Sequence, residues 1–278
     1  MKIGFIDYFL DEYHANHFPE WLKEASGGEM QVAYAYAKID SPLGGMTTDE
    51  WCAKYGIPRA ATIAELVEKC DAIVVLSPDN PEQHEELCQI PLASGKPVYV
   101  DKTFAPDKAS AERIFAIAQN SGTPCYSASS LLFAEEYRNI GRGKVANVVS
   151  FGAGKVETYS VHQIEPIIYL MGPDIERVMF TGSNTHESYV CEYADGRRAI
   201  VTHHNDWGVP FGMAVGLTDG SSKLLTVESS FNVPFMAGMV RFFRTHESSV
   251  PHEDTVAGIA VIEAAKKAAK VPGSWVAV

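Results

Sequence analysis

The chain has 278 residues, of which 46% are hydrophobic, and a formal net charge of −12. Its length favours two domains. An acidic chain without a basic cluster is a poor candidate for nucleic acid, whose phosphates are bound by grouped Lys and Arg. The five scattered cysteines favour reduced thiols in the cytoplasm and no zinc framework. Because the first apolar run is too short for a signal peptide and no later run reaches the ~18 residues of a membrane span, we expect no membrane partner.

The first half of the chain alternates apolar, β-branched runs with segments of helical periodicity. Expected strands lie at 3–6, 30–37, 72–76, 98–100 and 124–127, and expected helices at 15–25, 48–54, 62–69, 82–93 and 107–121. This alternation predicts an α/β fold, with a Rossmann-like parallel sheet in a first domain of residues 1–127. Ligands of such sheets bind beyond the carboxyl ends of the strands, where Ser77, Pro78 and Lys102 lie. Lys102 follows an apolar strand so closely that its ammonium should be partly desolvated, which makes it the first candidate for chemistry.

The loop after the first expected strand, residues 7–12, carries three carboxylates and no glycine. In dinucleotide-binding folds this loop is glycine-rich, because the pyrophosphate approaches the backbone closely at a helix N-terminus. Carboxylates at this place would repel a diphosphate, so the loop argues against ordinary dinucleotide binding. Its acidic residues, with His14 and His17, could gather a cation. A polar helix start with an exposed face is the simpler interpretation, and no metal site is predicted.

From residue 128 the pattern changes to short strands separated by turn signals such as Asp195-Gly196. A connecting helix is expected at 131–140, followed by strands at 145–151, 178–181, 188–193, 198–203, 213–217 and 223–228. Helices at 234–245 and 254–270 and a strand at 275–278 complete a second domain, residues 128–278. We expect an α+β domain with an open, mainly antiparallel sheet.

Ordered segments in both halves resemble the glucose-fructose oxidoreductase, inositol dehydrogenase and MocA (Gfo/Idh/MocA) family. They include Asp71–Val75, His84, Ser94–Val98 and Asp101–Lys102 in the first half, and Gly141–Val145, His162–Glu165 and Leu170–Gly172 in the second. Typical members are longer, so the chain resembles a divergent, shortened member with a degenerate dinucleotide-binding loop. The resemblance implies NAD or NADP as cofactor and a sugar, cyclitol or related polyol or keto compound as substrate. It also implies a homodimer or larger assembly, formed through the open sheet of the second domain.

The resemblance assigns Lys102 and His162 to the reacting oxygen of the substrate. His162 matches the residue that exchanges a proton with the substrate hydroxyl, a task that suits an imidazole titrating near neutrality. Where the family has an aspartate to orient this histidine, the chain has Thr158, and Glu165 keeps a carboxylate one helical turn further on. We count Thr158, Tyr159 and Glu165 as substrate-binding candidates. Without the resemblance, His162 would be interpreted as a hydrogen-bonded core residue.

The family's E-K-P triplet appears here as Asp101-Lys102-Thr103. Because a cis peptide is far more costly before residues other than proline, we expect a trans bond at Thr103. If a dinucleotide binds at all, the resemblance places Ser77, Pro78, His84 and Asp101 beside it.

Two functions therefore stay open from the sequence. One is an oxidoreductase that uses NAD or NADP, because side chains do not carry hydride. The other is a cofactor-independent homologue, either an isomerase or lyase with Lys102 and His162 as acid and base, or a non-catalytic protein that binds sugars or has a regulatory role. The missing glycines favour the second. A metal-dependent enzyme using the N-terminal acidic and histidine residues is a third, weaker hypothesis.

Overall fold

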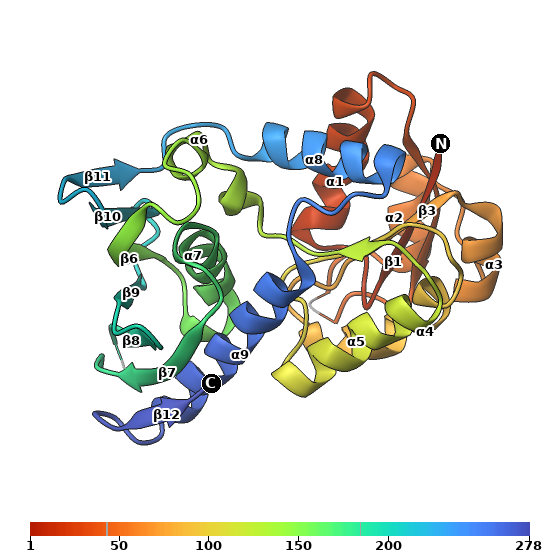
Figure 1. The fold of residues 1–278 in the computed structure, drawn as a ribbon. Helices are drawn as coiled ribbons and strands as arrows, with labels where there is room; N and C mark the ends of the chain where they lie inside the picture. Colours follow the sequence, from red (N-terminus) through yellow and green to blue (C-terminus); the bar gives the residue numbers. More distant parts are fainter. Residues whose placement is uncertain (43, 184) are drawn as a thin grey trace. The chain divides into compact units, whose positions relative to one another are not determined.

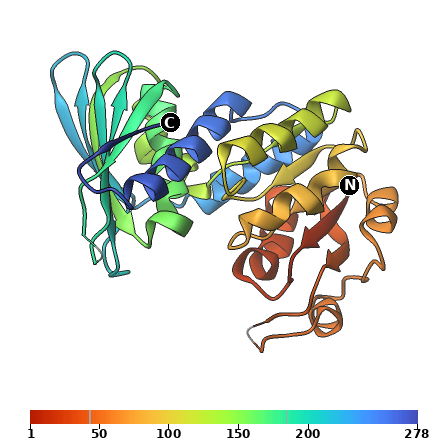
Figure 2. The ribbon, with the colours of Figure 1, turned by 90° about the horizontal axis from the view of Figure 1, so that it is seen from below.

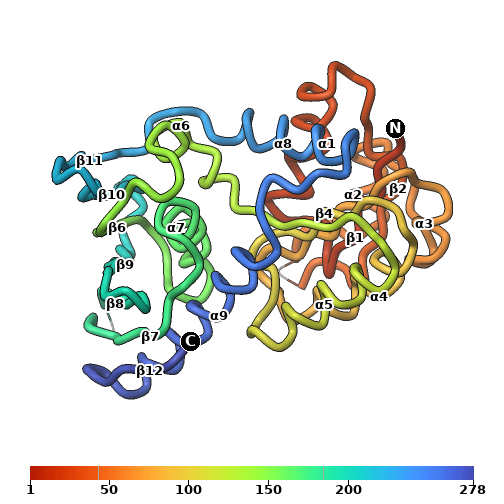
Figure 3. Tube along the Cα trace, viewed as in Figure 1, coloured from red at the N-terminus to blue at the C-terminus, as the bar shows by residue number. Residues whose placement is uncertain are grey.

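A computed structural model describes residues 1–42, 44–183 and 185–278 of the chain. It divides into two compact units, one formed by Met1–Ser127 with Phe235–Pro251 and the other by Ala128–Pro234 with His252–Val278. In the trace of Figure 3 the chain therefore enters each unit twice. The expected second domain of 128–278 is wrong in this respect, because 235–251 belongs with the first unit. No helix in the described part of the chain is both long and apolar enough to span a membrane.

The first unit contains a five-stranded parallel sheet of order β2-β1-β3-β4-β5. Its strands are β1 (Lys2–Asp7), β2 (Gln31–Ala37), β3 (Ala72–Val75), β4 (Val98–Val100) and β5 (Cys125–Tyr126). This confirms the predicted Rossmann-like fold. The strand order reverses between β1 and β3, so the residues that follow these two strands flank the position where ligands of such sheets bind.

Helices connect the strands of the first unit, as Figure 1 shows. They are α1 (Tyr13–Ala25), α2 (Thr48–Tyr55), α3 (Ile63–Lys69), α4 (His84–Leu92) after the short η1 (Pro81–Gln83), and α5 (Lys108–Asn120). Helix α8 (Asn232–Thr245) joins this unit through aromatic contacts. Phe235 lies 5.9 Å from both Phe18 and Tyr99, and Phe242 lies 4.6 Å from Tyr126, between ring centroids. Burial of these rings is the physical reason why a helix so late in the sequence packs here.

The second unit contains a seven-stranded sheet of order β11-β10-β6-β9-β8-β7-β12. Its strands are β6 (Val145–Ala153), β7 (Ile175–Phe180), β8 (Ser188–Tyr193), β9 (Arg198–His204), β10 (Gly212–Leu217), β11 (Ser222–Thr226) and β12 (Trp275–Ala277). Among the described strand pairs of this sheet, only β6–β9 is parallel. Helices α7 (Val156–Met171) and α9 (His252–Ala268) pack on one face of the sheet, as Figure 2 shows. The expected α+β unit with a mainly antiparallel sheet is confirmed.

The single helix expected at 131–140 is wrong. The chain forms a 3-10 turn, η2 (Ser130–Phe133), and a short helix, α6 (Glu135–Arg138). Between them, Ala134 has an extended backbone with ψ near 132°, which interrupts the helical hydrogen bonds. The apolar side chains of η2 are buried, so packing of Leu131 and Phe133 outweighs the local preference for one continuous helix.

Candidate functional site

Glu12 is the N-cap residue of α1. Its backbone is extended, and its carboxylate accepts hydrogen bonds from the backbone N–H groups of Ala15 and, at 2.7 Å, His14. In a dinucleotide-binding fold these free N–H groups receive the pyrophosphate. Here the protein's own carboxyl group already occupies them. Burial, together with the charges of Asp7 and Asp101, raises the pKa of Glu12 well above its ordinary value. The residues at this position therefore do not fit the pyrophosphate of NAD or NADP.

Asp7, the last residue of β1, is only 1% exposed. One carboxyl oxygen accepts from Ser77 Oγ at 2.9 Å and from the Tyr8 N–H at 2.7 Å, whereas Oδ2 has no hydrogen-bond partner in the described structure. Burial raises the pKa of Asp7 well above its ordinary value, and the charge of nearby Asp101 raises it further. The protonated carboxyl is thus favoured at a position where dinucleotide-binding loops carry no acidic side chain.

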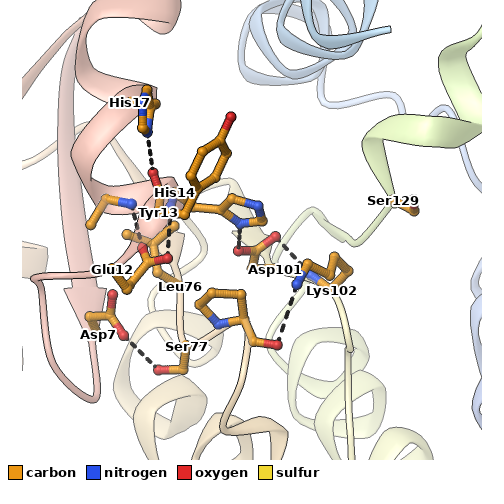
Figure 4. Close-up of polar contacts among 12 residues, drawn as sticks. Asp7, Glu12, Tyr13, His14, His17, Leu76, Ser77, Asp101, Lys102 and Ser129 are labelled. Carbon is orange, nitrogen blue, oxygen red and sulfur yellow. Dashed lines mark hydrogen bonds and ion pairs between the residues drawn. The ribbon is translucent and has the colours of Figure 1, made fainter. Parts of the chain in front are cut away.

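Figure 4 shows His14 reaching from α1 to Asp101 at the end of β4. Its Nδ1 contacts Asp101 Oδ2, and the other oxygen, Oδ1, accepts from the Lys102 N–H at 2.8 Å and from Tyr99 Oη at 3.2 Å. Burial alone would raise the pKa of Asp101, but the charge and hydrogen bond of His14, with the charge of Lys102, lower it. Asp101 is therefore a buried carboxylate held between a histidine and a lysine.

Lys102 is 7% exposed, and its Nζ lies 3.5 Å from Pro78 O. The peptide bond between Lys102 and Thr103 is cis, so the trans bond expected from the loss of proline is wrong. Hydrogen bonds to the residues before and after this peptide bond hold the turn, although residue 103 is not a proline. Asp101 binds the backbone of Lys102, and His84 Nδ1 binds the carbonyl of Phe104 at 3.0 Å.

Ser77 and His84 are both engaged with the protein itself. Ser77 has a φ of 78°, in the left-handed region, and its hydroxyl accepts from the Tyr8 N–H at 2.8 Å while donating to Asp7. His84 is fully buried, with Nε2 at 2.5 Å from Leu76 O and Nδ1 on Phe104 O. Burial lowers the pKa of His84. The ring thus lies between the carbonyl groups of the segments after β3 and β4, and its neutral form can donate to one of them.

In the second unit, His162 and Glu165 of α7 both bind Ser129. Ser129 Oγ lies 2.6 Å from His162 Nδ1, and the Ser129 N–H donates to Glu165 Oε2 at 2.6 Å. Ser129 also caps η2 by accepting from the Leu131 N–H at 3.2 Å. The sequence did not reveal which residue orients His162. In the structure, Ser129 forms a hydrogen bond with its ring.

Aromatic rings surround His162. The centroid of its ring lies 5.2 Å from Tyr159 and 5.9 Å from Phe211, and Tyr159 packs edge-on against Trp207 at 4.9 Å. Trp207 is 66% exposed. Thr158 donates its backbone N–H to Lys155 O at 3.3 Å, within the first turn of α7. Apolar rings beside a polar imidazole are typical of small-molecule sites.

The structure therefore groups the predicted residues into two clusters, one in each unit. Asp101, Lys102 and Pro78 lie together in the first unit, and His162, Glu165 and Tyr159 in the second. Sequence reasoning missed Ser129, and it missed His14 as the partner of Asp101. A histidine in the first turn of α1 was a visible signal for His14, but its partner was not. Among the described residues, no group of three or more His, Cys, Asp or Glu side chains is placed to hold a metal ion.

Residues 15–129 match the model of a family described as an oxidoreductase family with an NAD-binding Rossmann fold, GFO_IDH_MocA. Comparison with curated protein sequences gives no match. Among solved structures, the chain is similar to a probable dehydrogenase from Thermotoga maritima, with a TM-score of 0.80 and 15% identity over 100% of this chain and 98% of that one.

The chain is also similar to the apo scyllo-inositol dehydrogenase from Lactobacillus casei, with a TM-score of 0.76 and 14% identity over 99% of this chain and 97% of that one. A third similar structure is the biliverdin reductase from Synechocystis in complex with biliverdin and NADP⁺, with a TM-score of 0.69 and 13% identity over 98% of this chain and 99% of that one. These identities establish the fold alone. The similarity extends over nearly the whole of this chain and of each of the three structures.

Proposed function

We propose that the protein is an enzyme acting on a sugar, cyclitol or related polyol or keto compound. The match of residues 15–129 to the Gfo/Idh/MocA oxidoreductase family supports this proposal. The observation that carries this proposal is Lys102, a nearly buried ammonium at the carboxyl end of β4, beside the buried Asp101 carboxylate. A cation held there is suited to polarising a carbonyl or hydroxyl oxygen of a ligand. The similar fold of a scyllo-inositol dehydrogenase supports the substrate class.

We assign His162 to the same reacting oxygen on the strength of the family resemblance. The contact with Ser129 holds its Nδ1, and the aromatic rings of Tyr159 and Phe211 flank it. Such surroundings fix the orientation of an imidazole without removing its ability to exchange protons. Glu165, Tyr159 and Thr158 remain our candidates for substrate binding.

Two forms of this function differ in the cofactor. The redox form needs NAD or NADP, and Ser77, Pro78, His84 and Asp101 would then lie nearest to it. The cofactor-independent form is an isomerase or lyase, or a non-catalytic protein that binds sugars or has a regulatory role. The carboxylate of Glu12 on the N-terminus of α1 favours the cofactor-independent form, because it takes the place of a pyrophosphate.

Calorimetric titration with NAD⁺, NADH, NADP⁺ and NADPH at millimolar concentration separates the two forms. We expect no heat of binding, and no change in absorbance of the nicotinamide when a panel of polyols and keto sugars is added. A measurable heat together with substrate-dependent reduction of NAD⁺ or NADP⁺ would establish the redox form and exclude the other. Protein-observed NMR with the same panel detects binding of a polyol whether or not it reacts.

We further propose that the protein forms a homodimer or larger assembly through the uncovered face of the second unit's sheet. Paired positions form a continuous apolar row across all seven strands. The row consists of Leu224, Ala214, Val149, Ile200, Val190, Met179 and Trp275. None of these side chains is buried, and Val149 and Leu224 are 43% and 73% exposed. An apolar row of this extent indicates association.

We expect a cytoplasmic protein with no nucleic-acid or membrane partner.

Val149→Asp tests this assembly, because it places a charge on β6, next to the middle strand β9 of the row. We expect light scattering to show the wild-type protein above monomer mass and the variant at monomer mass. Glu176→Asp, on the exposed part of β7 outside the row, is the control and should keep the wild-type mass. A monomeric wild-type protein would refute the assembly.

A further inference from the structure

We propose that His14 is the proton-accepting base of a catalytic site in the first unit, with Asp101 as its positioning residue and Lys102 as the cation that stabilises a developing oxyanion. The substrate class is an α-hydroxy carbonyl compound, such as a keto sugar or a keto cyclitol. This inference rests on the cofactor-independent form of the proposed function, and it identifies a base that the family resemblance does not assign.

The geometry of His14 fixes the position of its proton. Asp101 is a carboxylate and can only accept, so the His14 Nδ1 bonded to it carries the hydrogen. The other ring nitrogen, Nε2, then has a free lone pair, and the described residues give it no hydrogen bond. The imidazole is stacked on Phe18, with 4.7 Å between centroids and 13° between planes. Its side chain is 18% exposed, so a ligand can reach part of the imidazole.

Asp101 also supplies the charge that such a base requires. When Nε2 accepts a proton, the ring becomes a cation, and the buried carboxylate next to Nδ1 stabilises it. Asp101 is itself held by Tyr99 Oη and the Lys102 N–H. A carboxylate fixed by three donors keeps the ring in one orientation, which favours proton transfer along one direction.

Lys102 is the third group of the site, because its ammonium has N–H groups that can bind a ligand. An ammonium has three N–H groups, and the described residues offer Lys102 Nζ a single long contact, to Pro78 O at 3.5 Å. The backbone of the same residue binds Asp101, so His14 and Lys102 flank one carboxylate, as Figure 4 shows. A carbonyl compound bound by Lys102 would therefore lie beside the carboxylate that also contacts His14.

The reaction that these groups support consumes no oxidant or reductant. His14 Nε2 takes the proton from the hydroxyl-bearing carbon next to the carbonyl. The electron pair of that C–H bond forms a C=C bond, and the π pair of the carbonyl moves onto oxygen, where Lys102 stabilises the charge of the enediolate. Return of the proton to the same carbon exchanges or inverts it. Return to the neighbouring carbon, with transfer of the hydroxyl proton to the former carbonyl oxygen, isomerises the substrate.

Proton exchange in D₂O tests the proposal without knowledge of the natural substrate. The probes are dihydroxyacetone, D-fructose and 2-keto-myo-inositol, and deuterium incorporation is followed by ¹H NMR and mass spectrometry. We expect the wild-type protein to exchange at least one probe above the buffer rate. His14→Gln should lower this rate by about 10²-fold or more. His17→Gln, one turn along α1 with its Nδ1 on Tyr13 O, should keep the wild-type rate.

A second measurement keeps the proposal testable if the variant folds poorly. Long-range ¹H–¹⁵N NMR of histidine-labelled wild-type protein should show His14 with its proton on Nδ1, and Asp101→Asn should shift this population toward Nε2. A wild-type His14 protonated on Nε2 would overturn the proposal.

The outcomes also separate this proposal from the function on which it rests. Exchange that survives in His14→Gln but is lost in His162→Gln would refute His14 as the base and leave the cofactor-independent function intact. No exchange of any probe, together with NAD⁺- or NADP⁺-dependent oxidation of a polyol, would overturn both. No exchange and no oxidation would overturn the role of His14, whereas NMR would still report whether the protein binds a polyol.

Discussion

Two histidines, one in each unit, each have a hydrogen-bond partner at the ring nitrogen Nδ1, but the two partners differ. His14 Nδ1 contacts the buried carboxylate of Asp101, and His162 Nδ1 lies 2.6 Å from the hydroxyl of Ser129. A carboxylate only accepts, so it fixes the proton on Nδ1 and stabilises a protonated ring. A hydroxyl both donates and accepts, so it fixes neither the proton nor the charge. The partners of Nδ1 thus differ in whether they can fix the proton on that nitrogen.

The largest expected effect comes from removing these two partners in turn. Asp101→Asn should reduce deuterium exchange of the keto probes by about 10²-fold or more, because it removes the charge that stabilises the His14 cation. Ser129→Ala should reduce it by less than about tenfold. The rate at saturating probe should fall in Asp101→Asn, with little change in the half-saturating concentration. Equal losses in both variants would remove the distinction between the two histidines.

Lys102→Met should have the next largest effect, a reduction of about 10²-fold in exchange, because the enediolate oxygen loses its cation. The measurement is the same NMR assay, with circular dichroism to confirm folding. Lys23→Gln, an exposed lysine in the last turn of α1, is the matched control for loss of one positive charge. An unchanged rate in Lys102→Met would exclude it from the reaction.

Asp7→Asn should stabilise the protein at alkaline pH. Because burial raises the pKa of Asp7 in the folded state, its contribution is fully present below the unfolded pKa of about 3.9 and is lost as the pH rises through the folded value. Asparagine cannot ionise, so the variant does not lose this part of the free energy of unfolding as the pH rises. We expect the free energy of unfolding in urea to favour Asp7→Asn increasingly from pH 5 to pH 8, by about 1 kcal/mol or more.

The exposed Asp79→Asn serves as the control for Asp7→Asn and should show no such trend with pH. If the wild-type protein instead gains stability over Asp7→Asn between pH 5 and pH 8, Asp7 is ionised in the fold and the interpretation is wrong.

The smallest expected effect is that of Glu12→Ala, which removes the cap of the helix that carries His14. Loss of the two hydrogen bonds to the Ala15 and His14 N–H groups should lower the free energy of unfolding by about 1 kcal/mol. Urea denaturation measures this, and Glu20→Ala on the exposed side of α1 is the comparison. A change as small as that of Glu20→Ala would show that the cap contributes nothing to stability.

Local patterns in the sequence were sufficient for the Rossmann-like sheet. The apolar runs that became β1, β3 and β4 are short, β-branched and bounded by polar residues, and each pairs in a parallel sheet. The same patterns placed Lys102 at a strand end. They failed at residues 131–140 and 235–251, where the outcome depended on burial of side chains against distant elements.

What the sequence by itself determined is the family resemblance, the alternation of strands and helices, and the absence of glycine from residues 7–12. What only the tertiary structure decided are the partners: His14 meets Asp101 across 87 residues, Asp7 meets Ser77 across 70, and His162 meets Ser129 across 33. The physical reason is that periodicity and caps depend on neighbours within a few residues. A hydrogen bond between strand ends depends instead on the order and register of the whole sheet, to which every intervening residue contributes.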